Sequence, residues 1–196
     1  MSGQLTPDQA VTRLLRGNAR FVAGRLDHPH QSARRRRAVS ASGQQPFAII
    51  LSCADSRVPP EIIFDQGLGD LFVIRVAGNV LDDVILGTIE YAVEHLHTPL
   101  VMVLGHDKCG AVTAAVERVA INNHVQAVVD ALRPALLMAE GQEGDPVSTV
   151  VDANVRYAVR KLQADAPVLM GACAAGQLRI VGARYNLDTG EVRIIA

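Results

Sequence analysis

The chain has 196 residues, with 19 Lys and Arg against 20 Asp and Glu, and 49% of its residues are hydrophobic. This length suits one domain with a sizeable core, and the apolar fraction excludes a disordered chain. A formal net charge of -1 gives no general reason to expect a nucleic acid or an anionic membrane as partner. We therefore expect a soluble globular domain that binds neither.

Compartment and processing are predicted from the first residues and the cysteines. The first residues are polar and amphipathic and lack the apolar segment of a secretory signal. No window approaches about 18 uninterrupted apolar residues, so no membrane-spanning helix is expected. Cys53, Cys109 and Cys173 are odd in number and far apart, which does not suit a disulfide framework. These features favour a reducing compartment, and we expect the cytoplasm.

The N-terminal part of the chain predicts one helix followed by an exposed connection. Thr6 can cap a helix, Pro7 suits its first position, and apolar residues then recur at helical spacing to about Ala23. Residues 24–45 are rich in Arg, Ser, His and Gly and predict a connection with one short helix near 34–39. The arginines at 34–37 are interpreted as a solvated face or a subunit contact rather than a nucleic-acid patch.

From Pro46 onward, short apolar runs alternate with helical segments. Runs this short and this continuous are typical of strands buried on both faces of a parallel sheet. Strands are predicted at 47–51, 71–74, 100–104, 178–185 and 192–195, with a turn at 186–190 before the last. Helices are predicted at 84–96, 111–119, 125–138 and 147–162, with Pro134 marking a break or kink in the third.

The order of these elements predicts a single alpha/beta domain over residues 1–196, with a mainly parallel central sheet flanked by helices. Within it, residues 1–45 form an N-terminal helical arm and connection, and residues 46–196 form the core. The sequence shows no internal repeat and no linker polar enough to separate two domains.

Reactive side chains follow two of the predicted strands. Cys53, Asp55 and Arg57 come directly after the first strand, and His106 and Cys109 come directly after the third. Because the carboxyl ends of parallel strands form the crevice where ligands bind, these side chains are expected to converge.

The residue types in these two segments suit a metal ion. Cys53, His106 and Cys109 offer two thiolates and one imidazole, and either Asp55 or water could take a fourth position. Zinc accepts all of these ligands in a tetrahedral shell, although cobalt or iron would also fit. Each residue alone would be explained as a packing residue, as we interpret Cys173. Their arrival together at two strand ends favours a metal site.

The paired pattern Cys53-x-Asp55-x-Arg57 and His106-x-x-Cys109-Gly110 resembles the motifs of the beta-class carbonic anhydrases. These are zinc enzymes that interconvert carbon dioxide and bicarbonate. Segments 55–59, 69–75, 77–79 and 87–93 are also similar to the family's intervening segments. The resemblance implies that Cys53, His106 and Cys109 are permanent ligands of one Zn²⁺ per subunit, and that Asp55 and Arg57 are the family's Asp/Arg pair.

The implied Asp/Arg pair suggests a switch. Two residues apart in an extended segment, Asp55 and Arg57 point to the same side, where a guanidinium can hold a carboxylate by a bidentate contact. When Arg57 holds Asp55, the zinc keeps a position open for water; when Asp55 turns onto zinc, the site is closed. Because two thiolates already cancel the zinc charge, we expect zinc-bound hydroxide to attack carbon dioxide more effectively at alkaline pH.

The same resemblance implies a substrate cleft. Gln44 would donate to bound bicarbonate, Phe72 and Ala77 would form an apolar wall, and the backbone amide of Gly110 would lie near the site. Gln44 could equally be a solvated loop residue, Phe72 part of the core, and Gly110 a turn at a helix start. One subgroup has a noncatalytic bicarbonate site that depends on a Trp, and this sequence contains 0 Trp, so that form of control is not expected.

The resemblance also bears on proton transfer, assembly and alternatives. Histidines 28, 30, 95, 97 and 124 are candidate proton shuttles, although each is better explained as a surface residue. The family builds its cleft between two subunits, with the N-terminal helix lying on the partner, which implies a homodimer or a dimer of dimers. Similar proteins hydrolyse carbonyl sulfide or carbon disulfide with the same ligands. A zinc-dependent bicarbonate sensor is the alternative outside the enzymes.

Overall fold

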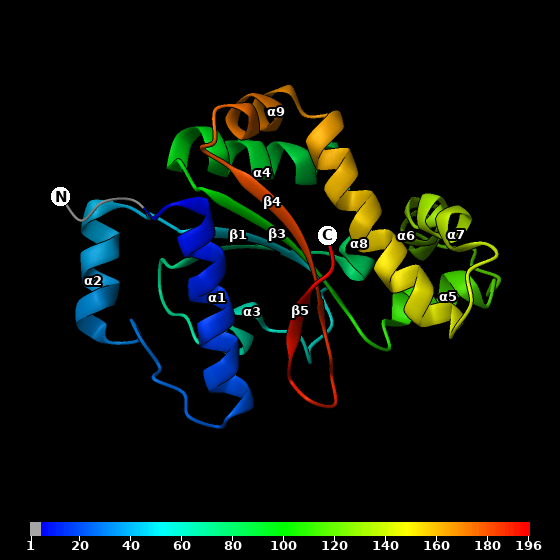
Figure 1. Cartoon of the computed structure of the whole chain (residues 1–196), viewed down its shortest axis with the longest axis horizontal. Coiled ribbons are helices and arrows are strands. Elements are labelled where there is room, and N and C mark those ends of the chain that lie inside the picture. Colours follow the sequence, from blue (N-terminus) through cyan, green and yellow to red (C-terminus); the bar gives the residue numbers. More distant parts are fainter. Residues whose placement is uncertain (1–4) are drawn as a thin grey trace.

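The computed structural model describes residues 5–196, and its centre is a 5-stranded sheet in the order β2-β1-β3-β4-β5 (Figure 1). The first four strands pair in parallel, and β5 runs antiparallel to β4. The strands are β1 Ala48–Ser52, β2 Leu71–Arg75, β3 Leu100–His106, β4 Arg179–Tyr185 and β5 Val192–Ile194. The predicted mainly parallel sheet is confirmed. Residues 1–4, which the sequence analysis placed in the N-terminal arm, lie outside the described residues.

Two of the inner strands, β1 and β3, explain the continuous apolar runs of the sequence. Every residue of both strands is buried. Successive side chains of a strand point to opposite faces, so Ile49 and Leu51 enter one hydrophobic cluster while Ile50 enters another. A strand covered on both faces has no polar side to present to water, and strict alternation is therefore lost.

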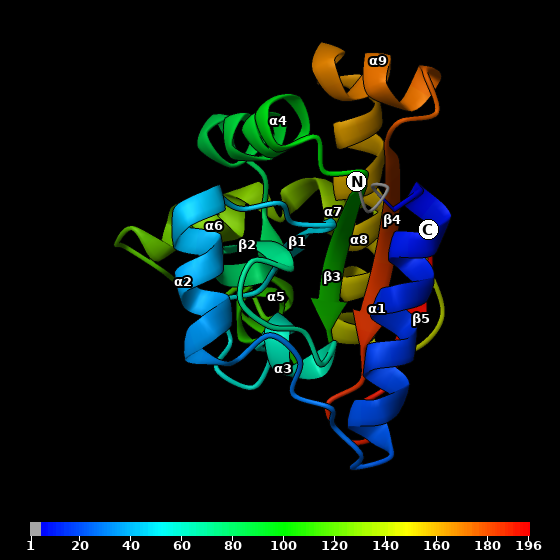
Figure 2. The ribbon, with the colours of Figure 1, turned by 90° about the vertical axis from the view of Figure 1, so that its left-hand side faces the viewer.

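Helices cover both faces of the sheet (Figures 1 and 2). On one face, α4 (Asp83–Leu96), α8 (Pro146–Ala164) and α9 (Pro167–Ala174) share a hydrophobic cluster with the sheet. On the other, α1 (Pro7–Val22) and α3 (Pro60–Ile63) do the same. A third cluster holds the N-terminal half of α8 against α5 (Gly110–Val116), α6 (Val125–Ala131) and α7 (Arg133–Ala139). Cys53 and Cys109 belong to this third cluster, so the metal-ligand candidates lie where α8 meets the sheet edge.

Several boundaries differ from those predicted. The helix expected at 125–138 is two helices, α6 and α7, with Pro134 in the first turn of α7. The helix expected at 111–119 ends at Val116, and Arg118 adopts a left-handed conformation (φ 51°) that stops it. Helices α3 and α9 and the short 3₁₀ helix Ala77–Asn79 were not expected.

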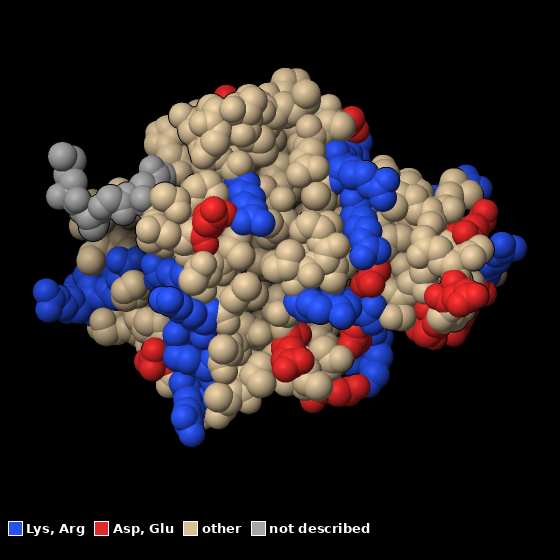
Figure 3. Space-filling view, viewed as in Figure 1, with Lys and Arg blue, Asp and Glu red and all other residues tan. Residues whose placement is uncertain are grey.

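The N-terminal arm contains the long helix α1 and the separate helix α2 (Ala33–Ser42). Helix α1 starts with a capping box between Thr6 and Gln9, as the prediction of a helix from Thr6 to about Ala23 requires. Helix α2 is longer than expected and buries none of its residues. Lys and Arg side chains gather over α2 and beside α1 in the space-filling view (Figure 3).

Within residues 5–196, we find no helix with the length and apolar character that spanning a membrane requires.

Candidate metal centre

Three predicted metal ligands converge at the carboxyl edge of the sheet. Cys53 directly follows β1, His106 ends β3, and Cys109 is the N-cap residue of α5. Strands β1 and β3 are parallel neighbours, so their carboxyl ends lie side by side. The ligand atoms of the three residues all lie within 4.8 Å of one another. Cys53 is only 5% exposed, and Cys109 and His106 are each 1% exposed.

The imidazole of His106 is oriented for ligation through Nε2. Its Nδ1 lies 2.8 Å from the carbonyl oxygen of Asp107, and because a carbonyl can only accept, Nδ1 carries the proton. That tautomer leaves a lone pair on Nε2. Within the described residues Nε2 is buried and has no hydrogen-bond partner. The Nε2 lone pair thus lies beside two thiols with no hydrogen bond, as expected of an imidazole that ligates a metal ion.

The two thiols shift each other's pKa in opposite directions. The side-chain hydrogen bond from Cys109 lowers the pKa of Cys53 to about 4, with help from the backbone N–H groups of Asp55 and Gly78, although burial opposes the shift. The same hydrogen bond, together with burial, raises the pKa of Cys109. A divalent cation would displace the remaining proton, because thiolates are the ligating form. Two thiolates and one imidazole fit Zn²⁺.

Asp55 and Arg57 form a bidentate ion pair beside these donors. Arg57 donates from Nε to Oδ1 (3.0 Å) and from Nη2 to Oδ2 (2.7 Å) of Asp55, and its backbone N–H also donates to Oδ1 (2.9 Å). The hydrogen bond from Arg57 lowers the pKa of Asp55 to about 2, so the carboxyl is ionised at neutral pH. The side chain of Arg57 is 52% exposed and that of Asp55 is 17% exposed.

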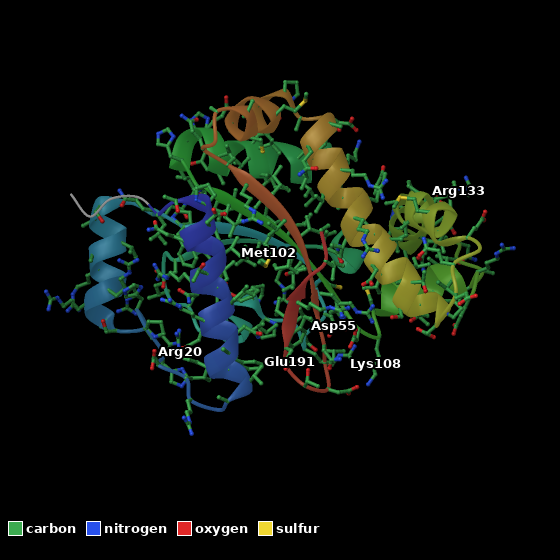
Figure 4. The ribbon with its side chains drawn as sticks, in the orientation of Figure 1. Arg20, Asp55, Met102, Lys108, Arg133 and Glu191 are labelled. Atoms are coloured by element: carbon green, nitrogen blue, oxygen red, sulfur yellow. The ribbon has the colours of Figure 1, made fainter. Side chains whose placement is uncertain are left out.

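The guanidinium of Arg57 also links the two motifs. Its Nη2 donates to the carbonyl oxygen of Lys108, 3.3 Å away, in the loop between His106 and Cys109. Figure 4 shows Asp55 and Lys108 at the same end of the sheet. The ion pair is therefore anchored to the loop that carries two of the donors.

The four substrate-cleft candidates lie in four different segments of the fold. Gly110 is exposed and starts α5, next to Cys109. Ala77 is half-buried in the 3₁₀ helix. Phe72 is half-buried in β2, and its ring centroid lies 6.4 Å from that of Tyr91. Gln44 lies in the exposed loop between α2 and β1.

Three residues that support the donors, Gly78, Asn154 and Arg75, were not predicted from the sequence. The backbone N–H of Gly78 donates to Cys53 Sγ (3.4 Å), and Asn154 of α8 donates to the Gly78 carbonyl (2.8 Å). Arg75 donates to the carbonyl oxygens of Cys53 (3.1 Å) and Asp55 (2.6 Å). Asn154 is a buried polar residue on an apolar helix face, and Arg75 directly follows an apolar run. Both were visible in the sequence as polar residues in apolar surroundings.

Gly78 has a backbone reason to be glycine. Its φ of 69° lies in the left-handed region, and an added Cβ would lie 3.2 Å from the Cβ of Ala111. The turn that brings its N–H to Cys53 therefore tolerates no larger residue without strain.

The candidate proton shuttles are all exposed: His28, His30, His95, His97 and His124. His30 Nδ1 contacts the buried carboxylate of Asp70 at 2.8 Å, and the His95 ring centroid lies 5.1 Å from that of Tyr91. The exposure of all five agrees with their interpretation as surface residues.

Comparison with known proteins identifies the family. A family model described as "Carbonic anhydrase" matches residues 48–192. "Carbonic anhydrase 2" of Mycobacterium tuberculosis is 47% identical over 191 residues, covering 94% of this chain and 91% of the relative. A carbonic anhydrase of Mycolicibacterium smegmatis is 42% identical over 192 residues, covering 96% and 93%.

Solved structures agree with the sequence relatives. A structure described as one of two tetrameric beta-carbonic anhydrases from Sordaria macrospora superposes with a TM-score of 0.75 at 25% identity, covering 84% of this chain and 87% of that one. The fold, the matching family model and the close sequence relatives all agree. The chain belongs to the beta-class carbonic anhydrases and is an enzyme of that family.

Proposed function

We propose that this enzyme catalyses the reversible hydration of carbon dioxide to bicarbonate and a proton, with one Zn²⁺ per subunit held by Cys53, His106 and Cys109. The convergence of three buried donor atoms within 4.8 Å of one another carries the proposal. The membership of the chain in the carbonic anhydrase family supports it.

When bound, Zn²⁺ supplies Lewis acidity, which makes water a nucleophile near neutral pH. The chain moderates that effect through its two thiolates, whose charges offset the charge of the cation. Three neutral imidazoles would leave the full charge in place. We therefore expect activity to rise toward alkaline pH.

Asp55 and Arg57 are proposed to gate the fourth ligand position. In the paired arrangement the guanidinium occupies both carboxylate oxygens of Asp55 and keeps them from a cation. If Arg57 releases it, Asp55 becomes a third anionic ligand candidate and closes the site. Because the pKa of Asp55 is lowered to about 2, this carboxylate accepts hydrogen bonds and orients a donor such as water, but does not take up a proton near pH 7.

The substrate cleft and the subunit assembly are proposed together. Gln44, Phe72, Ala77 and Gly110 are proposed to contact carbon dioxide or bicarbonate, in a cleft completed by a partner subunit. The N-terminal helix α1, which was predicted to lie on a partner, packs Ala10 and Leu14 into the core of its own chain. Helix α2 buries no residue, so it is the part of the arm that supports a contact with a partner. A Sordaria macrospora relative described as tetrameric supports a homodimer or a dimer of dimers. The cytoplasm stays a prediction from the cysteines.

The test is stopped-flow carbon dioxide hydration by the purified, zinc-loaded enzyme, scanned from acid to alkaline pH beside an Asp55→Ala variant. We expect zinc-dependent hydration that rises with pH, and a profile that changes when Asp55 is removed. Undiminished activity well below neutral pH would contradict the mechanism.

A protein that binds zinc stoichiometrically yet hydrates no carbon dioxide at any pH would overturn the proposed substrate. Turnover of carbonyl sulfide or carbon disulfide would then assign a related hydrolase. Bicarbonate binding without any turnover would assign a sensor.

A further inference from the structure

Arg184 of β4 joins the metal-centre loop to helix α8. In the sheet it pairs with Gly105, the residue before His106. Its Nε donates to Asp107 Oδ1 at 2.6 Å, and its Nη1 donates to Asp152 Oδ1 at 3.0 Å and to the Ser148 carbonyl at 3.2 Å. The side chains of Arg184, Asp107 and Asp152 are mostly buried, at 17%, 13% and 23% exposure. One guanidinium thus pairs with two mostly buried carboxylates.

Asp107 is fixed by each of its polar groups. Its carboxylate is held by Arg184, and its backbone N–H donates to the Tyr185 carbonyl at 3.1 Å. Its own carbonyl oxygen accepts the Nδ1–H of His106 at 2.8 Å. The oxygen that selects the His106 tautomer therefore belongs to a residue whose side chain and backbone are both tied to β4.

We propose that Arg184 is a positioning residue for the metal centre: by clamping Asp107 between β4 and α8, it fixes the carbonyl that orients His106 Nε2 toward the metal ion. The inference rests on the proposed function, because it takes His106 as a zinc ligand. Arg184 itself touches neither His106 nor the thiols in any contact that the structure gives, so its effect is carried by Asp107.

The contacts that run from α8 through Arg184 and Asp107 to His106 form a relay, and its end in α8 is rigid. Asp152 and Ser148 both lie in α8, whose neighbouring residues Val150, Val151 and Val155 are buried in the core. A partner of a metal-ligating histidine tunes affinity by holding the ring in place, and losing such a partner costs about 10- to 100-fold in metal affinity or activity. Buried, charge-assisted hydrogen bonds to a packed helix suit that task better than an exposed contact does.

A second ion pair joins the metal-centre loop to the turn after β4 and provides a matched control. Lys108 Nζ lies 2.8 Å from Asp188 Oδ1, and these side chains are 61% and 69% exposed. Asp188 lies in the turn after β4, four residues beyond Arg184. The contacts given for Asp188 do not include Asp107. Removing the Asp188 carboxylate breaks the link between the metal-centre loop and the turn after β4 but leaves the contacts of Arg184 and Asp107 in place.

The test compares Arg184→Met, Asp107→Ala and their double variant with wild type and with the control Asp188→Asn. Zinc affinity is measured by competition with a chromogenic chelator. Exchange of the His106 Nδ1–H with solvent is measured by NMR on ¹⁵N-histidine-labelled, zinc-loaded protein.

We expect each single variant to bind zinc about 10- to 100-fold more weakly and to exchange Nδ1–H faster. The double variant should bind zinc no more weakly than the weaker-binding single variant, because the two substitutions interrupt the same relay. Asp188→Asn should match wild type.

Several results would overturn the inference. One is wild-type zinc affinity and Nδ1–H exchange in Arg184→Met and Asp107→Ala, even with lowered melting temperatures, because that pattern marks a purely structural role. Additive losses in the double variant are another. If Arg184→Met does not fold, Asp107→Ala decides, since it leaves the contacts of Arg184 with α8 in place. Equal zinc binding by wild type and Cys109→Ser would instead overturn the proposed function together with this inference.

Discussion

The candidate metal centre has two sides that differ in their exposure to solvent. The donor side consists of Cys53, His106 and Cys109, which are at most 5% exposed. The Asp–Arg side consists of Asp55 and Arg57, and the guanidinium side chain of Arg57 is 52% exposed. Strand ends, α5 and α8 hold the donor side, whereas the Asp–Arg side is held mainly by its own ion pair and by the Lys108 carbonyl.

The difference indicates a division between permanent and exchangeable contacts. Buried groups that lose a partner incur a large desolvation cost, so the donor side is fixed in one arrangement. An exposed ion pair contributes little to stability and can break and reform at small cost. The fold therefore places the groups proposed to hold a metal ion in the core, and the groups proposed to gate it where solvent reaches them.

The largest expected effect comes from removing a donor. Cys109→Ser should lower zinc affinity by more than about 100-fold, since loss of a ligand exceeds loss of its hydrogen-bond partner. Carbon dioxide hydration should fall to background. Metal content by mass spectrometry and stopped-flow assays check this, with Cys173→Ser as the control, because Cys173 is a half-buried cysteine of α9 outside the site. Equal losses in the two variants would contradict a special role for Cys109.

The next effect concerns the Asp–Arg side. Arg57→Ala should lower kcat/KM for carbon dioxide about 100-fold, as expected when a group that arranges a reacting site is removed, while zinc content stays at wild-type level. Adding Asp55→Ala should restore part of the activity if the freed carboxylate blocks the site. Arg156→Ala, which removes an exposed guanidinium from α8, should leave kcat/KM unchanged. Loss of zinc in Arg57→Ala would erase the distinction between the two sides.

The packing behind the donor side gives a smaller effect. A Cβ at Gly105 would lie 2.6 Å from Val155 Cγ2 of α8, so Gly105→Ala should push β3 and α8 apart. We expect it to lower the unfolding free energy by about 1–3 kcal/mol. Gly87→Ala in α4 is the matched control: nothing lies within 4 Å of its added Cβ, and it should stabilise by up to about 1 kcal/mol. Urea unfolding of the zinc-loaded enzyme measures both.

The smallest effect is the pH dependence of the Asp55–Arg57 pair. The pKa of Asp55 is lowered from its ordinary value of 3.8 to about 2 by the hydrogen bond from Arg57. A lowered pKa means that the pair stabilises the fold fully above pH 3.8 and ceases to do so as pH falls toward 2. The stability difference between wild type and Asp55→Asn should be constant from neutral pH down to about 4 and shrink below it. Urea unfolding of metal-free protein measures it, and a difference that grows on acidification would contradict the assignment.

The sequence predicted the sheet and the donors because both depend on local pattern. The apolar runs around Ile50 and Met102 identify buried parallel strands, and the motifs that follow them mark the site. Pro134 was recognised as a disturbance, but whether it kinked or divided the helix depended on packing.

The supporting contacts of the site could not be predicted in the same way. Asn154 reaches Gly78 across 76 residues, and Arg184 reaches Asp107 across 77. Such pairs are fixed by tertiary geometry, and no spacing rule connects them. Helix α3 is too short to carry a periodic signal.

The pairing of β3 with β4 has a consequence for the order in which the enzyme is completed during synthesis. Both motif cysteines are translated well before Arg184, which follows Asp107 by 77 residues. At ribosomal rates that interval is roughly 4 to 15 s. Until β4 emerges, β3 has only β1 beside it, and the loop after β3 lacks its clamp. The nascent chain therefore carries both motif cysteines through this interval before the loop after β3 gains its contacts with β4.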